Sequence, residues 1–233
     1  MKSSTDLLCE GIDLLRQKDG EIERLITPRK DECVSLLDRY VKEIELFNEA
    51  YGLVGTNDTE ELIIKHILDS LAPLRIISRL LKELCAISAD GSLPQIADAG
   101  SGAGLPGIPL AIAMPHCNFT LIERMGRRAG FLWNTKAALG LSNVTVEEGE
   151  LEKTAPKRFN LITFRAFKPL DAKLLKTLFA ACAEGGVIAA YKGRREKIEQ
   201  EVSFLKDSGR WEAAPYNVPF LEEERHLVII KLL

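Results

Sequence analysis

The sequence has little that would tie a chain together covalently or anchor it in a membrane. Its five cysteines are odd in number and widely spaced, without a Cys-x-x-Cys pair, which argues against a disulfide framework and a zinc site. No apolar run approaches the roughly 18 residues of a membrane-spanning helix. Acidic and basic residues nearly balance, at 34 and 31, so no overall positive field indicates a nucleic-acid partner. The three histidines are too scattered to suggest a catalytic triad.

Other absences narrow the class of protein. Segment 1–13 carries acids among few apolar residues and lacks the apolar core of a signal peptide. Together with unpaired thiols, this predicts a cytoplasmic protein. The 233 residues are 46% hydrophobic and 28% charged, which is typical of a globular chain and excludes disorder, collagen and a coiled coil. We expect a monomer whose core needs no metal, and no membrane contact.

Two parts of the chain differ in their patterns. Residues 1–93 are predicted to be helical, because apolar residues return every three or four positions, as in segment 31–51. Further helices are expected at 59–71 and from Pro73 to about residue 85, with a loop at 89–94. We interpret this part as a helical extension packed on a core domain formed by residues 94–233.

In the second part, short apolar runs alternate with helical stretches. Strands are expected at 95–99, 118–123, 143–147, 159–164, 187–192, 211–218 and 226–232, and helices at 107–114, 126–140, 170–183 and 195–206. This alternation predicts an α/β fold with a mostly parallel seven-stranded sheet, covered on both faces. Segment 219–225 is too short for a crossover helix, so the last two strands should form an antiparallel hairpin.

The segment I-A-D-A-G-S-G-A-G-L-P-G-I-P-L, at 96–110, is the most informative. Its four glycines lie between a predicted strand and a predicted helix, where they let the backbone turn sharply and approach a ligand. Residues 102–107 match the dinucleotide fingerprint G-x-G-x-x-G, which is a weak signal by itself. The loop therefore predicts a nucleotide-like cofactor, but it does not distinguish one such cofactor from another.

Two acidic residues beside this loop help to choose the cofactor. Glu123 ends the next predicted strand, where a carboxylate bonds the ribose of either a dinucleotide or an adenosyl cofactor. Asp98, just before the first glycine, would repel a pyrophosphate but suits an ammonium or sulfonium group. S-adenosylmethionine carries both groups, and the antiparallel hairpin is typical of the methyltransferase variant of the fold. A nicotinamide-dependent oxidoreductase using residues 102–107 stays an alternative.

Motifs along most of the chain support a resemblance to a known family. They are F-N-E-A-Y-G-L (47–53), K-H-I-L-D-S-L (65–71), D-A-G-S-G-A-G-L-P-G-I-P-L (98–110), G-R-R-A-G-F-L (126–132), R-A-F (165–167), Y-K-G (191–193) and E-R-H-L-V-I-I-K (224–231). In these motifs the chain resembles the RsmG (GidB) family of bacterial small-subunit ribosomal RNA methyltransferases.

The resemblance implies a Rossmann-like fold and S-adenosyl-L-methionine as cofactor. It also implies methylation of ring nitrogen seven of a guanine in 16S-type ribosomal RNA, either naked or in an assembling ribosomal particle. A cofactor-binding scaffold for ribosome assembly, without catalysis, is a second alternative. The cofactor contacts that the resemblance implies are Gly100, Leu105, Leu151, Glu152 and Arg165, to which the arguments above add Asp98, Gly102 and Glu123.

Methylation of this guanine nitrogen needs no general base, because the nitrogen has an in-plane lone pair. We therefore expect no catalytic residue, only alignment of the reactants. Asp69 is a candidate for contact with the guanine edge, although a helix cap or surface acid is the preferred interpretation, and His66 is interpreted as a packing histidine. The basic residues expected to bind RNA phosphates are Arg127, Arg128, Lys192, Arg194, Arg195 and Arg225.

Overall fold

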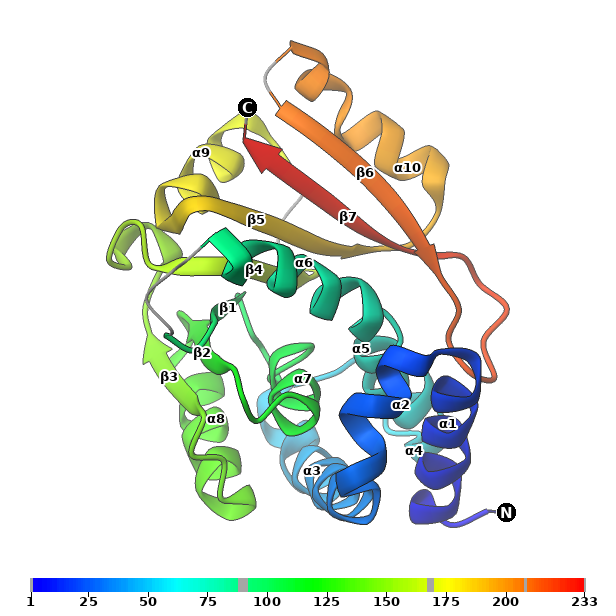
Figure 1. Cartoon of the computed structure of the whole chain (residues 1–233). Coiled ribbons are helices and arrows are strands. Elements are labelled where there is room, and N and C mark those ends of the chain that lie inside the picture. The colour runs from blue at the N-terminus through cyan, green and yellow to red at the C-terminus, as the bar shows by residue number, and fades with distance from the viewer. Residues whose placement is uncertain (1, 88–91, 167–169, 208, 233) are drawn as a thin grey trace.

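A twisted seven-stranded sheet forms the centre of the molecule (Figure 1). The computed structural model describes residues 2–87, 92–166, 170–207 and 209–232. The strands are β1 (Gln95–Ala99), β2 (Asn118–Glu123), β3 (Val144–Glu148), β4 (Phe159–Arg165), β5 (Cys182–Lys192), β6 (Gly209–Tyr216) and β7 (Arg225–Leu232). Their order is β3-β2-β1-β4-β5-β7-β6, with β1 to β5 parallel and β7 antiparallel to both neighbours. The predicted parallel sheet with a C-terminal antiparallel hairpin is confirmed.

The strands are apolar because both faces of the sheet are covered. In β5, Val187, Ala189 and Tyr191 contribute to the core on one face, and Ile188 and Ala190 to the core on the other. This alternation is the two-residue period of an extended chain. A strand buried on both faces therefore has a continuous apolar run, which is what made these strands recognisable.

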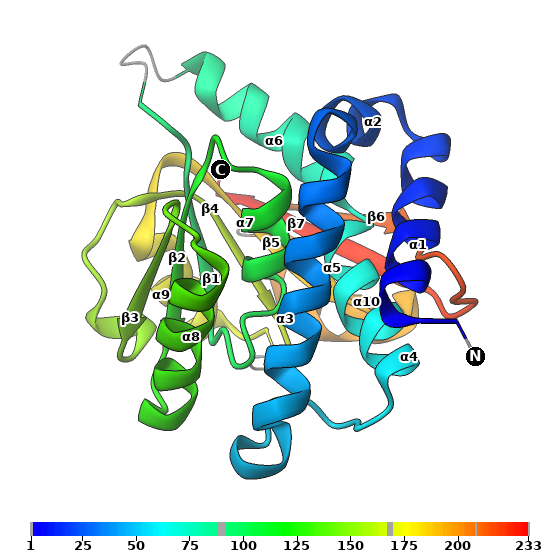
Figure 2. The same cartoon turned by 90° about the horizontal axis from the view of Figure 1, so that it is seen from below.

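Helices cover both faces of the sheet. On one face lie α1 (Ser4–Lys18), α2 (Gly20–Ile26), α3 (Lys30–Tyr51), α6 (Leu74–Ile87), α7 (Gly107–Ala113) and α8 (Gly126–Leu139). On the other lie α9 (Ala172–Ala181) and α10 (Arg195–Glu201), followed by a short 3-10 helix, η4 (Ser203–Asp207). Figures 1 and 2 show the N-terminal helices beside α7 and α8 on one side of the sheet. They share one apolar core with the strands, and a domain boundary at residue 93 stays a prediction.

The helix predicted at 59–71 contains a wider turn. It consists of α4 (Thr59–Leu62), a π-helical segment η2 (Ile63–Leu68) and α5 (Asp69–Leu71). Asp58 begins it, and its side chain accepts a hydrogen bond from the Glu61 amide at 2.7 Å, as an N-cap residue does. At the end of η2 the Asp69 amide donates to the carbonyl of Ile64, five residues back, and to that of His66. Such π turns are frequent at functional sites.

Some predicted boundaries were wrong. β5 begins at Cys182 and not at 187: Cys182 pairs with Phe159 of β4, and after an irregularity in which the register shifts, the pairing resumes at Val187. β6 spans Gly209–Tyr216 and not 211–218, and the helix predicted at 195–206 divides into α10 and η4. Of the loop predicted at 89–94, residues 89–91 lie outside the described residues. In the described part of the chain, no helix combines the length and the apolar character that a membrane crossing requires.

Candidate functional site

The glycine loop joins β1 to α7 at the carboxyl end of the sheet. Gly100, Gly102 and Gly104 have φ values of +67°, +58° and +92°, a region that side chains with a Cβ rarely adopt. The amides of Gly100 and Ser101 donate to the Ile122 carbonyl at 2.9 and 3.0 Å. The loop is therefore fastened to the end of β2, and its glycines are required by the backbone.

Asp98 lies beneath this loop and is fully buried. Its Oδ2 accepts hydrogen bonds from the Ser101 hydroxyl at 2.6 Å and the Gly107 amide at 2.9 Å. Among the described residues, its Oδ1 has no hydrogen-bond partner. Burial raises the pKa of Asp98 to about 6, and the bonds from Ser101 and Gly107 oppose that rise. Asp98 thus ties the strand to the loop, and its contact with a cofactor stays a prediction.

Glu123 connects the end of β2 to the same loop. It is 4% exposed, and its Oε2 accepts a hydrogen bond from the Gly102 amide at 2.9 Å. Its Oε1 accepts one from the Met125 amide at 2.8 Å. Each carboxylate oxygen has a second lone pair that can accept a bond from a ligand hydroxyl. Glu123 can therefore hold the loop and a ribose together.

A cavity of about 360 Å³ opens beside the ends of β1, β2 and β3. Its volume is in the range of small-molecule sites. It brings together four of the predicted cofactor-binding residues, Gly100, Glu123, Leu151 and Glu152. Arg128, predicted to bind RNA, also lines it, as does Lys173 near the start of α9, which sequence analysis missed. Leu105 lies in the apolar core instead, at 5% exposure.

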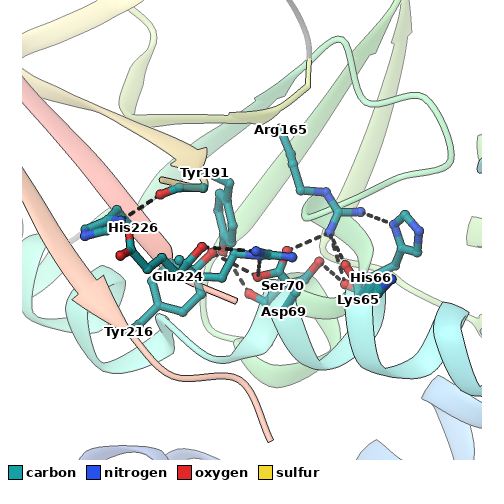
Figure 3. A network of polar contacts seen from close by, with 11 residues as sticks. Lys65, His66, Asp69, Ser70, Arg165, Tyr191, Tyr216, Glu224 and His226 are labelled. Atoms are coloured by element: carbon teal, nitrogen blue, oxygen red, sulfur yellow. Dashed lines mark hydrogen bonds and ion pairs between the residues drawn. The ribbon is translucent and has the colours of Figure 1, made fainter. Parts of the chain in front are cut away.

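Arg165, at the end of β4, faces the N-terminal helices in Figure 3. Its Nη1 donates to Asp69 Oδ2 at 3.1 Å and to the carbonyls of Lys65 and His66 at 3.2 and 3.4 Å. Its Nη2 lies 2.8 Å from His66 Nδ1. Because a guanidinium only donates, that nitrogen accepts and the ring proton is on Nε2. Burial, and then the charge of Arg165, lower the pKa of His66 to about 4, so the ring is neutral at pH 7.

Asp69 is the centre of this network. It is 3% exposed, and its Oδ1 accepts a hydrogen bond from the Tyr216 hydroxyl at 3.0 Å and lies 3.5 Å from Arg225 Nε. The interpretation of Asp69 as a helix cap or surface acid was therefore wrong. Both of its oxygens are engaged by the protein. Arg225 is partly buried by this contact, and its predicted role in RNA binding is untested.

The other predicted RNA-binding residues differ in their solvent exposure. Arg127, Arg194 and Arg195 are exposed, and Arg195 forms a 2.9 Å ion pair with Glu199. Lys192 is paired at 2.7 Å with Glu201, and its side chain is 17% exposed. Arg128 donates to the Gly52 carbonyl at 2.7 Å. Arg127 and Arg194 are thus the most open of the set, and RNA binding by all of them stays a prediction.

Most of the chain is similar in sequence to one protein family. The family model GidB, described as rRNA small subunit methyltransferase G, matches residues 34–228. The chain belongs to the GidB family. A "Ribosomal RNA small subunit methyltransferase G" of Treponema denticola is 37% identical, and the match covers 98% of this chain and 96% of that protein. A protein of the same name from Treponema pallidum strain Nichols is 42% identical over 84% of each chain.

Solved structures support the fold of this GidB member. A SAM-dependent methyltransferase from Aquifex aeolicus is similar at a TM-score of 0.52, with 15% identity, over 76% of this chain and 94% of that one. At that identity the similarity shows the fold alone, and it confirms the expected Rossmann-like methyltransferase architecture. The comparisons favour neither alternative, the nicotinamide-dependent oxidoreductase or the scaffold without catalysis.

Proposed function

We propose that this chain is an S-adenosylmethionine-dependent methyltransferase that methylates ring nitrogen seven of a guanine in small-subunit ribosomal RNA. The observation that carries the proposal is the glycine loop, which is hydrogen-bonded to Glu123, and the helix after it, which is hydrogen-bonded to Asp98. The chain that contains this loop is a member of the GidB family. We propose that the substrate is either naked RNA or RNA in an assembling ribosomal particle. Such a substrate would place the protein in the cytoplasm, where we propose that it acts as a monomer.

The residues around the cavity fit this cofactor. Glu123 offers acceptor lone pairs for the ribose hydroxyls, and Leu151 is an apolar wall, with Glu152 next to it, for the adenine. Gly100 and Gly102 let a ligand approach the backbone. The fully buried Oδ1 of Asp98, unpartnered among the described residues, leaves a negative group under a ligand that carries positive charge. A pyrophosphate at this loop would be repelled by Asp98, which disfavours a dinucleotide.

For methyl transfer, the protein needs mainly to align the cofactor with the guanine. The cofactor supplies an electrophilic methyl group on a sulfonium sulfur. The guanine nitrogen uses its own lone pair to form the new bond, while the carbon–sulfur pair returns to sulfur, so no proton is removed. Holding the reactants in line contributes several kcal/mol. The chain's residues bind and orient the two reactants, and the exposed cations Arg127 and Arg194 offer phosphate contacts outside the cavity.

Calorimetry with the purified chain tests the cofactor. Binding of S-adenosylmethionine is expected, and binding of NAD is not, because Asp98 would repel a pyrophosphate. A methyl-transfer assay on unmodified small-subunit RNA and particles, read by mass spectrometry of nuclease digests, tests the product. Binding of NAD without binding of S-adenosylmethionine would favour the oxidoreductase. Cofactor binding without transfer to either substrate would favour the scaffold.

Glu123→Ala is expected to weaken S-adenosylmethionine binding by roughly 10- to 100-fold, because charge-assisted hydrogen bonds contribute about 1.5–3 kcal/mol. These bonds exist in both ground and transition states, so the apparent Michaelis constant for the cofactor should rise more than turnover at saturation falls. Calorimetry and initial rates measure the two effects. Glu123→Asp, which keeps the carboxylate, is the matched control and should lose much less. Unchanged affinity in Glu123→Ala would refute the ribose assignment.

A further inference from the structure

The buried network around Asp69 has features that packing alone does not require. Asp69 and Arg165 are 96 residues apart in sequence, and Tyr216 is 147 residues from Asp69. The network therefore joins the N-terminal helices to the ends of β4 and β6 and the start of β7 (Figure 3). A carboxylate at 3% exposure between two guanidinium groups is costly to bury, and removal of a charged partner from such a buried pair is strongly destabilising. Such an arrangement fixes side-chain positions closely.

Arg165 lies where the cofactor loop begins. Thr163 on β4 pairs with Asp98 on β1 in the parallel register, and β4 ends two residues further along at Arg165, whose charge opposes the rise that burial causes in the pKa of Asp98. The gap between these strand ends is at the carboxyl edge of the sheet, where open α/β folds bind ligands. Arg165 therefore stands beside the place where the proposed function puts the reactants.

The N-terminal segment is shaped to hold the Arg165 guanidinium. At the end of the π turn the Asp69 amide bonds to the carbonyls of Ile64 and His66. The Lys65 carbonyl between them accepts from Arg165 Nη1. The Asp69 carboxylate and the His66 ring add two further acceptors to the same guanidinium. With 15% of its side chain exposed, Arg165 has little freedom to move. Of its acceptors, only Asp69 carries a charge that balances it.

We propose that Asp69 is a positioning residue for methyl transfer: its carboxylate fixes the Arg165 guanidinium at the reaction edge and offsets its charge. The inference rests on the proposed function. Methylation of nitrogen seven leaves the guanine with a positive charge, which an unbalanced guanidinium nearby would oppose. Asp69 removes that opposition and leaves Arg165 as an oriented donor. Because both Asp69 oxygens are already engaged, it acts through Arg165 and not by touching the base.

A double-mutant cycle tests this assignment. Asp69→Asn, which keeps the shape, and Arg165→Lys, which keeps the charge, are compared singly and together on unmodified small-subunit RNA or particles at saturating cofactor. Each single variant is expected to lower kcat by roughly 10- to 100-fold, since small misplacements near the reactants have effects of this size. The kcat of the double variant should be no more than about threefold below that of the less active single variant. The first substitution already abolishes the contact between the two side chains, so the second has little left to remove. Losses that multiply would overturn the proposal.

Tyr216→Phe is the matched control, because it removes a hydrogen bond from the other oxygen of Asp69 and leaves Arg165 untouched. Its kcat is expected within about threefold of wild type, and a loss equal to that of Asp69→Asn would assign the network to stability alone. The affinity of these variants for S-adenosylmethionine, measured by calorimetry, should either stay unchanged or show the same non-additive pattern as kcat. Additive losses of affinity would count against the proposal. If circular dichroism shows Asp69→Asn unfolded, Asp69→Glu enters the same cycle. A wild-type chain without methyl transfer would overturn the proposed function itself, whereas an active wild type with multiplying losses overturns only the role of Asp69.

Discussion

Small-subunit ribosomal RNA from cells that lack this chain is expected to have lost one 7-methylguanosine, with its other modified nucleotides unchanged. If the cavity beside the glycine loop holds the cofactor as proposed, one bound cofactor serves one target base at a time, so the loss should fall on one nucleotide. Mass spectrometry of nuclease digests measures it directly, because the modified base differs by one methyl group. The expected change is from near-complete methylation to none.

Complementation makes this result specific to the chain. A wild-type copy should restore the methyl group, and an Arg165→Ala copy, expressed at the same level, should not. Arg165 bonds to three residues of the N-terminal segment, so the variant also loosens that segment from β4. An unchanged content of 7-methylguanosine in the deletion strain would show that the functional assignment is wrong, even though the fold and the family stand.

The parts of the fold that follow from local pattern were predictable from the sequence. β1, β2 and β4 are apolar runs bounded by turn residues, and their positions were predicted within one residue. The glycine loop was recognisable because backbone geometry alone demands glycine at Gly100, Gly102 and Gly104. The antiparallel hairpin followed from the length of one connection. Each of these features depends on neighbours in sequence.

The Asp69 network was not predictable, because its partners are distant in sequence. Nothing near Asp69 in the chain indicates that two arginines and a tyrosine from three strands will surround it, so a cap or surface acid was the natural interpretation. Arg225 was assigned to RNA from its charge, although it forms an ion pair with Asp69 across the fold. Asp98 and Glu123 were correctly placed beside the loop. Their bonds to the loop backbone depend on the precise turn and needed the structure.

Gly107→Ala is expected to destabilise the protein and to abolish cofactor binding. A Cβ at this position would lie 2.4 Å from a Leu121 methyl carbon and 2.7 Å from Asp98 Oδ2, closer than such atoms approach. Relief requires that α7 or the buried carboxylate move, and overpacking of this kind typically costs about 1–3 kcal/mol. Any such shift stretches the bond from the Gly107 amide to Asp98, which fixes the glycine loop. Thermal unfolding and calorimetry with S-adenosylmethionine measure the two losses.

Gly130→Ala is the matched control. Gly130 is exposed in the interior of α8, and a Cβ there meets no atom within 4 Å. Alanine is the better helix former by about 0.5–1 kcal/mol, so this variant should unfold at a slightly higher temperature and bind the cofactor as wild type does. The contrast separates steric contact from the general effect of replacing glycine. If Gly107→Ala bound S-adenosylmethionine as tightly as Gly130→Ala, the link between Asp98 and α7 would not control the cofactor site.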